Sequence, residues 1–181
     1  LEYHDRWKSV TLSELMGKQQ KPWHDPGKGY RYSGDRVAYK GGDYMAETKE
    51  KEEIDAIAMK SLDQFVEICQ EAGIQVMFME MPSANSWNMA RHRAVADYAS
   101  SRNISFIDFN MKDRMKETGF DWMTDSRDGG NHLNYAGASA VTKDLAKKLT
   151  DDLTMNPTSL TKEQKQQWKK DYEHFHKSIV K

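Results

Sequence analysis

A short polar run near the C-terminal end of the chain combines the residue types of an acid–base pair. In Asp128-Gly129-Gly130-Asn131-His132, a carboxylate and an imidazole stand four positions apart, with two glycines between them. A histidine that acts as a general base needs one ring nitrogen toward the nucleophile and the other donating to a fixed acceptor, usually a carboxylate. The run therefore suits acyl transfer or hydrolysis, with His132 as the base and Asp128 as the acid that orients it.

The same run is also compatible with an ordinary turn. Asp, Gly and Asn are common turn residues, and Asn134 can cap the helix that follows. A metal site is less favoured, because none of the other histidines forms a His-x-x-x-His or HExxH pair with His132. We therefore expect neither a metal nor an organic cofactor, and both the catalytic and the turn interpretation stay open from spacing alone.

Apolar periodicity predicts the elements that position this loop. Short apolar runs bounded by Gly and Pro indicate buried strands, whereas repeats at helical spacing indicate amphipathic helices. The predicted elements, in order, are a helix at 46–72, a strand at 74–80, a helix at 86–102, a strand at 104–110, a short helix at 111–117, a helix at 134–150 and a last helix after Thr161. A further short helix is expected within residues 1–20.

The alternation of helix and strand is typical of an α/β fold with a parallel sheet. Two strands are too few for an independently stable sheet, so we expect further βα units before Leu1. The first residue is Leu rather than Met, which also suggests a piece of a longer protein. In open α/β folds ligand sites lie at the rim of the sheet, and His132 precedes the helix at 134–150.

Composition divides the chain into three segments and excludes some classes. We expect an aromatic, Gly-rich segment at 1–45, an α/β segment at 46–155 and an amphipathic helix within 156–181. Residues 21–45 are either an excursion over the surface or a wall of a substrate cleft. The net charge of -1 offers no basic field for nucleic acid, and the single cysteine, Cys69, excludes an internal disulfide.

The block Asp128…His132-Leu133-Asn134…Gly137 resembles the last conserved block of the SGNH (GDSL-type) hydrolase superfamily. More narrowly, it is similar to the HLN-x-x-G variant of bacterial extracytoplasmic relatives, some of which work beside membrane-bound O-acyltransferases. MPSANSWN (81–88) and SFIDFN (105–110) also look like that subgroup. The resemblance covers roughly residues 46–150.

This resemblance implies a three-layer α/β/α sandwich with a parallel sheet, incomplete in this chain. It implies His132 as the general base and Asp128 as its acid, although the usual spacing is Asp-x-x-His, which leaves Asp125 as a second candidate acid. The family's Gly-Asp-Ser turn has no counterpart here, so the nucleophilic serine is expected upstream and the chain alone is expected to be inactive. The candidate substrate contacts are Asn131, Asn134, Ser83 and Trp87.

Two functions follow from the resemblance. The first is a serine esterase or O-acyltransferase that acts on acylated cell-envelope carbohydrate outside the membrane, with a membrane-bound O-acyltransferase as a possible partner. The second is a non-catalytic module of degenerate SGNH fold that binds carbohydrate or a partner. A Gly-(Asp/Ser)-Ser turn after a first strand, upstream of Leu1, would discriminate the enzyme from the binding module.

Overall fold

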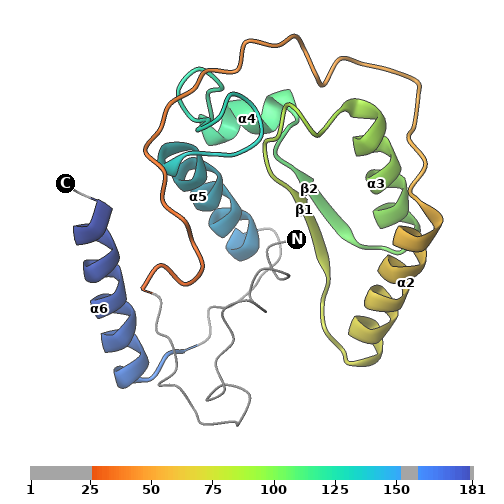
Figure 1. Ribbon diagram of the computed structural model, residues 1–181. Helices are drawn as coiled ribbons and strands as arrows, with labels where there is room; N and C mark the ends of the chain where they lie inside the picture. The colour runs from red at the N-terminus through yellow and green to blue at the C-terminus, as the bar shows by residue number, and fades with distance from the viewer. Residues whose placement is uncertain (1–25, 152–158, 180–181) are drawn as a thin grey trace, which may run out of the picture. The chain divides into compact units, whose positions relative to one another are not determined.

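The computed structural model describes residues 26–151 and 159–179 (Figure 1). The described residues fall into two compact units, one of residues 26–31 and 159–179 and the other of residues 32–151. The larger unit contains the Asp128–His132 loop. The short helix expected within residues 1–20 lies outside the described residues.

The described residues form a mixed α/β structure with five helices and a two-stranded parallel sheet. Strands β1 and β2 pair in register from Met77 opposite Ser105 to Glu80 opposite Asp108. The elements of the larger unit are α2 (Ala56–Glu71), β1 (Met77–Glu80), α3 (Met89–Ser101), β2 (Ser105–Asp108), α4 (Lys112–Thr118) and α5 (Tyr135–Asp151). The smaller unit contains α6 (Lys162–Ile179).

Helix α2 begins later than its apolar pattern predicts. The expected start at residue 46 is wrong, because the carboxylate of Asp55 accepts hydrogen bonds from the backbone N–H groups of Ile57 and Ala58 and so caps the helix. An aspartate in this position satisfies N–H groups that have no partner within the helix. The residues from 46 to 55 are not helical.

Two apolar clusters lie on opposite faces of the strands. Successive side chains of a strand point to opposite faces, so Phe106 enters one cluster and Ile107 the other. In Figure 1, α2 and α3 lie on one side of β1 and β2, and α4 and α5 lie on the other. The buried members of the first cluster are Val66, Tyr98, Ala99 and Ile104, and those of the second are Phe109, Phe120 and Val141.

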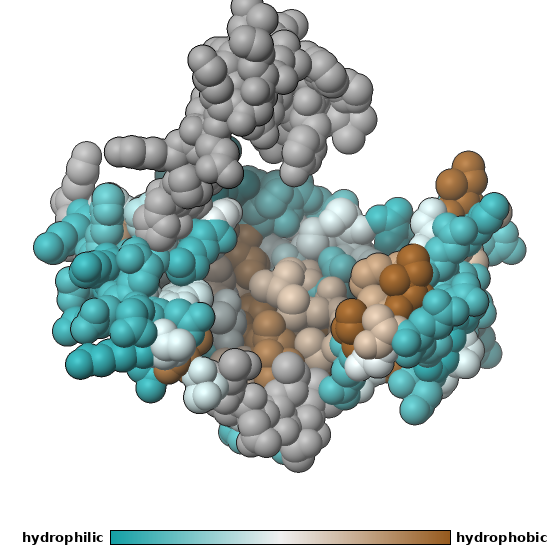
Figure 2. All heavy atoms as spheres, turned by 90° about the horizontal axis from the view of Figure 1, so that it is seen from below, coloured by the Kyte–Doolittle hydropathy of each residue, from teal (hydrophilic) through white to brown (hydrophobic). Residues whose placement is uncertain are grey.

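Part of the apolar surface remains exposed. Ile57, Phe65 and Ile68 of α2 are 78%, 53% and 64% exposed, although the sequence pattern places all three on the inner face. The packed face is formed by the buried Val66 and Cys69, with Leu62 beside Val66. Figure 2 shows apolar side chains reaching the surface together on one side of the protein. Helix α2 therefore carries two apolar stripes, of which one is packed.

Candidate acid–base site

Asp128 and His132 meet in the structure. Asp128 Oδ2 lies 2.5 Å from His132 Nδ1, while the imidazole side chain is 60% exposed and the carboxylate side chain 34%. When Nδ1–H donates to the carboxylate, the lone pair of Nε2 is left to accept a proton. The ring is thus oriented on one side and reachable from solvent, which is the arrangement that a general base requires.

The second oxygen of Asp128 holds the loop itself. Oδ1 accepts hydrogen bonds from the backbone N–H groups of Asn131 at 3.0 Å and His132 at 2.9 Å. The exposed Asn131 contributes this backbone group. One carboxylate therefore fixes both the backbone that carries the imidazole and the direction of the imidazole ring.

These hydrogen bonds keep the acid ionised. Partial burial raises the pKa of the Asp128 carboxyl, but the His132 ring and the backbone N–H groups of His132 and Asn131 outweigh that effect and lower the pKa from 3.8 to about 2. A carboxyl whose pKa is depressed by folding contributes stability above its unfolded pKa, and it loses that contribution as the pH falls through the folded value. The window for Asp128 therefore runs from 3.8 down to about 2.

We expect Asp128 to be largely ionised at pH values around 3, where ordinary aspartates are mostly protonated. A ¹³C NMR titration of the side-chain carboxyl carbon measures this directly. His132→Ala removes the ring donor and should move the midpoint upward, toward 3.8. A midpoint in the wild-type protein that already equals that of a free aspartate would contradict the hydrogen-bonded pair.

The side chain of Ser126 hydrogen-bonds to the backbone of the same loop. Its side chain is fully buried, and Oγ accepts the backbone N–H groups of Gly129 and Gly130, both at 3.0 Å, and more weakly that of Asp128 at 3.4 Å. The hydroxyl also donates to the carbonyl oxygen of His132 at 3.3 Å. Sequence reasoning missed this residue, because a serine in a polar turn carries no periodic signal.

The ends of the loop are closed by backbone hydrogen bonds. Arg127 N–H donates to the His132 carbonyl at 3.0 Å, and Asn134 N–H donates to the Asp125 carbonyl at 2.9 Å. The side chain of Asn134 is buried and makes four further hydrogen bonds. Two of them cap α5, and two reach the carbonyl groups of Asp35 and Thr124. Asn134, a candidate substrate contact, is thus directed into the fold.

The loop also packs against two other segments. Residues 33–37 run beside it, and the Val37 N–H donates to the Ser126 carbonyl at 2.9 Å. On another side, Asn85 donates from its backbone N–H to the Gly130 carbonyl at 3.0 Å. A Cβ on Gly130 would lie 2.8 Å from Asn85 Nδ2, and the φ of Gly130 is +136°. Gly130 is therefore favoured by its backbone conformation, and the exposed Asn85 side chain would have to shift to admit a Cβ.

We expect Gly130→Ala to destabilise the protein by about 2 kcal/mol, since a non-glycine residue is strained at this φ. Gly129→Ala is the matched control. Its φ of +77° lies closer to the left-handed region, and its added Cβ would meet Val37 Cγ1 at 3.4 Å. That substitution should cost about 1 kcal/mol. Urea unfolding of the two variants compares them, and equal stability would contradict the greater backbone strain expected at Gly130.

The remaining candidate residues lie apart from the imidazole. The Asp125 carboxylate is buried and accepts hydrogen bonds from the Asp121 N–H and the Thr124 hydroxyl, each at 2.9 Å. Asp125 therefore supports the turn that precedes the loop, and the carboxylate that meets the His132 ring is that of Asp128.

Ser83 and Trp87 follow β1 in the loop that also contains Asn85. The buried Ser83 donates its backbone N–H to Asn110 Oδ1 at 2.8 Å, and its hydroxyl pairs with that of Ser86. Trp87 Nε1 donates to Asp108 Oδ2 at 2.8 Å. Neither side chain hydrogen-bonds to His132 within the described residues.

Comparisons of the chain with protein-family models, with curated proteins and with solved structures find no match. Within residues 26–151 and 159–179, no group of three or more His, Cys, Asp or Glu side chains is arranged to hold a metal ion. No helix in this part of the chain is long and apolar enough to cross a bilayer.

Proposed function

We propose that the chain carries the base and the acid of an SGNH-like serine esterase or O-acyltransferase that acts on acylated cell-envelope carbohydrate. The observation that carries this proposal is the 2.5 Å contact between Asp128 and His132 in a glycine loop that leads into α5. The loop is closed by Ser126, and its imidazole is exposed. A pair of this kind suits proton transfer at an ester.

In the proposed mechanism, a serine supplied by sequence before Leu1 attacks the ester carbonyl. His132 Nε2 takes the serine proton as the nucleophile adds, and returns it to the leaving oxygen. Asp128 holds Nδ1–H and stabilises the imidazolium that forms. Water or an acceptor hydroxyl then releases the acyl group, again with His132 as the base.

The proposed fold is an α/β/α sandwich with a wider parallel sheet than the two strands described. Its support is the packing of apolar clusters on both faces of β1 and β2. In the proposal, upstream βα units extend the sheet and bring the serine to the rim where His132 lies. The extracytoplasmic location and the membrane-bound O-acyltransferase partner rest on the resemblance of the HLN-x-x-G block.

The test joins the 181-residue chain to its native upstream sequence and measures turnover of p-nitrophenyl acetate. We expect measurable hydrolysis, and a loss of about 10⁴-fold in kcat on His132→Ala. Unchanged turnover in that variant would refute the assignment of the base. Far-ultraviolet circular dichroism checks that the variant is folded, and His174→Ala serves as a matched histidine control outside the larger unit.

The second candidate function is a non-catalytic module that binds carbohydrate or a protein partner. One observation favours it: within residues 26–151 and 159–179, the His132 ring pairs with Asp128 and not with a serine, and the Ser83 hydroxyl pairs with that of Ser86. If the upstream sequence lacks a Gly-(Asp/Ser)-Ser turn and the joined chain does not turn over ester, the binding function is the one retained.

A further inference from the structure

A second aspartate–histidine pair lies at the end of β2. His92 Nδ1 is 2.7 Å from Asp108 Oδ2, and Trp87 Nε1 donates to the same oxygen. The Asp108 side chain is 1% exposed and the His92 side chain 21%. The other carboxylate oxygen accepts the backbone and side-chain N–H groups of Asn110. His92 is therefore anchored through Nδ1 by a buried, fully hydrogen-bonded carboxylate.

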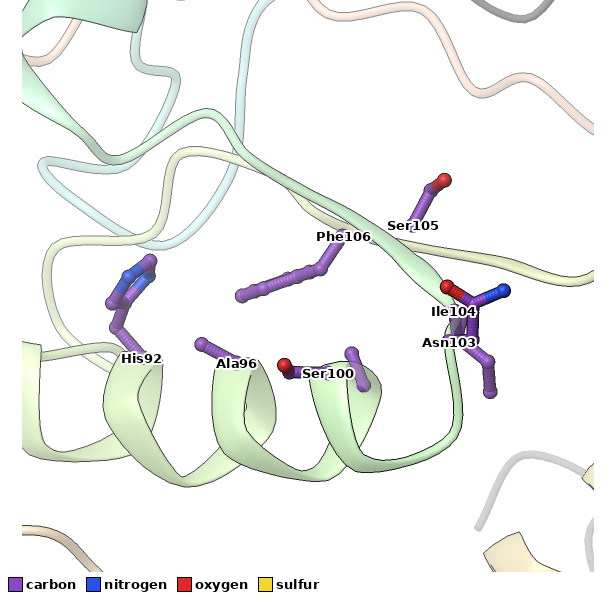
Figure 3. Close-up of a pocket in the computed structure, with 8 residues that line it drawn as sticks. His92, Ala96, Ser100, Asn103, Ile104, Ser105 and Phe106 are labelled. Atoms are coloured by element: carbon purple, nitrogen blue, oxygen red, sulfur yellow. The ribbon is translucent and has the colours of Figure 1, made fainter.

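A pocket of about 510 Å³ opens beside this pair, between α3 and β2. In Figure 3, His92 stands at one end, Asn103 and Ile104 stand at the other, and the ring of Phe106 projects from β2 toward α3. Ser100 and Ala96 lie along the helix that forms the opposite wall. The volume falls in the range that small-molecule sites usually occupy.

The pocket lining mixes polar with flat apolar groups. None of the described residues that line it is a lysine, an arginine, an aspartate or a glutamate. The rings of His92 and Phe106 lie 5.6 Å apart at 33° and make a broad aromatic wall. Ser100 and Asn103 supply a hydroxyl and an amide. Such a lining suits a ligand with hydroxyl groups and an apolar face rather than an ion.

We propose that this pocket is a binding site for a neutral, hydroxyl-bearing ring such as a hexose unit. With Nδ1–H directed to Asp108, the Nε2 lone pair of His92 accepts a hydrogen bond from a ligand hydroxyl. The apolar face of the sugar packs on the Phe106 ring. Binding here requires no ester chemistry at His132, so this site is independent of the proposed catalytic function, and it gives the carbohydrate-binding function proposed as the second candidate a specific location.

The two aspartate–histidine pairs are connected through the loop after β1. Asn85 contacts Gly130 in the Asp128–His132 loop, and Trp87 contacts Asp108 beside His92. Both sites belong to the larger unit. A carbohydrate held at His92 would therefore be bound to the same body that carries the exposed His132 imidazole.

The test uses the 181-residue protein with ¹⁵N-labelled histidine, titrated with methyl β-glucopyranoside and, separately, with inorganic phosphate. We expect a saturable shift of the His92 Nε2 resonance with the glycoside, at a Kd on the order of 1 mM, while phosphate causes none. Ser100→Gln fills the pocket from an exposed helix position and should weaken binding about tenfold. Ser101→Gln, on the same helix outside the lining, should leave the Kd unchanged.

Three outcomes would overturn the proposal: no saturable His92 shift with the glycoside, a shift with phosphate alone, or unchanged binding in Ser100→Gln. None of these outcomes bears on ester turnover by the joined chain, which is measured separately. Conversely, loss of the esterase proposal leaves a positive glycoside titration at His92 intact. The two hypotheses therefore fail independently.

Discussion

Asp128→Asn in the joined chain is expected to lower kcat for ester turnover by about 10⁴-fold without unfolding the protein. The amide keeps an oxygen that can accept the backbone N–H groups of Asn131 and His132, which now bond to Oδ1. It removes the negative charge that faces Nδ1 at 2.5 Å, so the imidazolium formed during the reaction is no longer stabilised. Steady-state assays of p-nitrophenyl acetate turnover measure the change in kcat.

Asp125→Asn is the matched control for this substitution. Its carboxylate bonds to the Asp121 N–H and the Thr124 hydroxyl and makes no hydrogen bond to the His132 ring. Any effect should come through stability, so kcat per folded molecule should fall by less than about tenfold. A larger loss of kcat in Asp125→Asn than in Asp128→Asn would identify Asp125 as the acid.

Asn110→Ala is expected to destabilise the protein by about 3 kcal/mol, because it leaves several buried polar groups without their hydrogen-bond partner. Asn110 is 0% exposed, and its Oδ1 accepts the Ser83 N–H at 2.8 Å and the Tyr44 hydroxyl at 3.1 Å. Its Nδ2 donates to the Met81 carbonyl and to Asp108 Oδ1, each at 2.9 Å. The side chain thus joins the segments that follow both strands.

Differential scanning calorimetry should show the midpoint of Asn110→Ala lowered by roughly 8 °C. Asn131→Ala replaces an exposed asparagine and should change stability by less than about 0.5 kcal/mol. Comparable melting temperatures for the two variants would show that the Asn110 hydrogen bonds contribute little. A loss of His92 anchoring in Asn110→Ala, seen in the histidine NMR spectrum, would place the effect at Asp108.

Local sequence patterns predicted the existence of α5 and α6. Helix α5 follows the sequence pattern, with Val141 fully buried and Leu145 packed beside it. Helix α6 begins after Thr161, as predicted, and Thr161 and Gln164 make reciprocal hydrogen bonds at its start. In both cases the information is local, because the residues that decide the structure stand three or four positions apart.

Features that depend on distant partners could not be predicted in this way. Helix α2 has two apolar stripes. Val66 is buried because its stripe packs against α3 and β2, whereas Phe65 lies on the other stripe and is exposed. Asn110 and Ser126 read as loop residues in the sequence. Their importance comes from hydrogen bonds made across the fold to Ser83 and within the folded loop to Gly130.

The Asp128–His132 pair could be predicted from the sequence only in part. The sequence indicated that the acid and the base share one loop, since two glycines between them allow an unusual turn. It left open whether Asp125 or Asp128 meets the ring. The positive φ values of Gly129 and Gly130 resolve the geometry, because they return the chain so that Asp128 reaches both the ring and the backbone of His132.

The two oxygens of the Asp128 carboxylate bind different parts of the loop, and together they orient the imidazole. One carboxylate oxygen accepts the peptide N–H groups of Asn131 and His132, and the other pairs with the imidazole ring, so the group that orients the ring is itself fixed to the main chain. In the proposed mechanism, these preorganised dipoles would lower the reorganisation energy as charge develops on the imidazole. A nucleophile in that mechanism would have to approach along the direction of Nε2, because the ring is held at Nδ1.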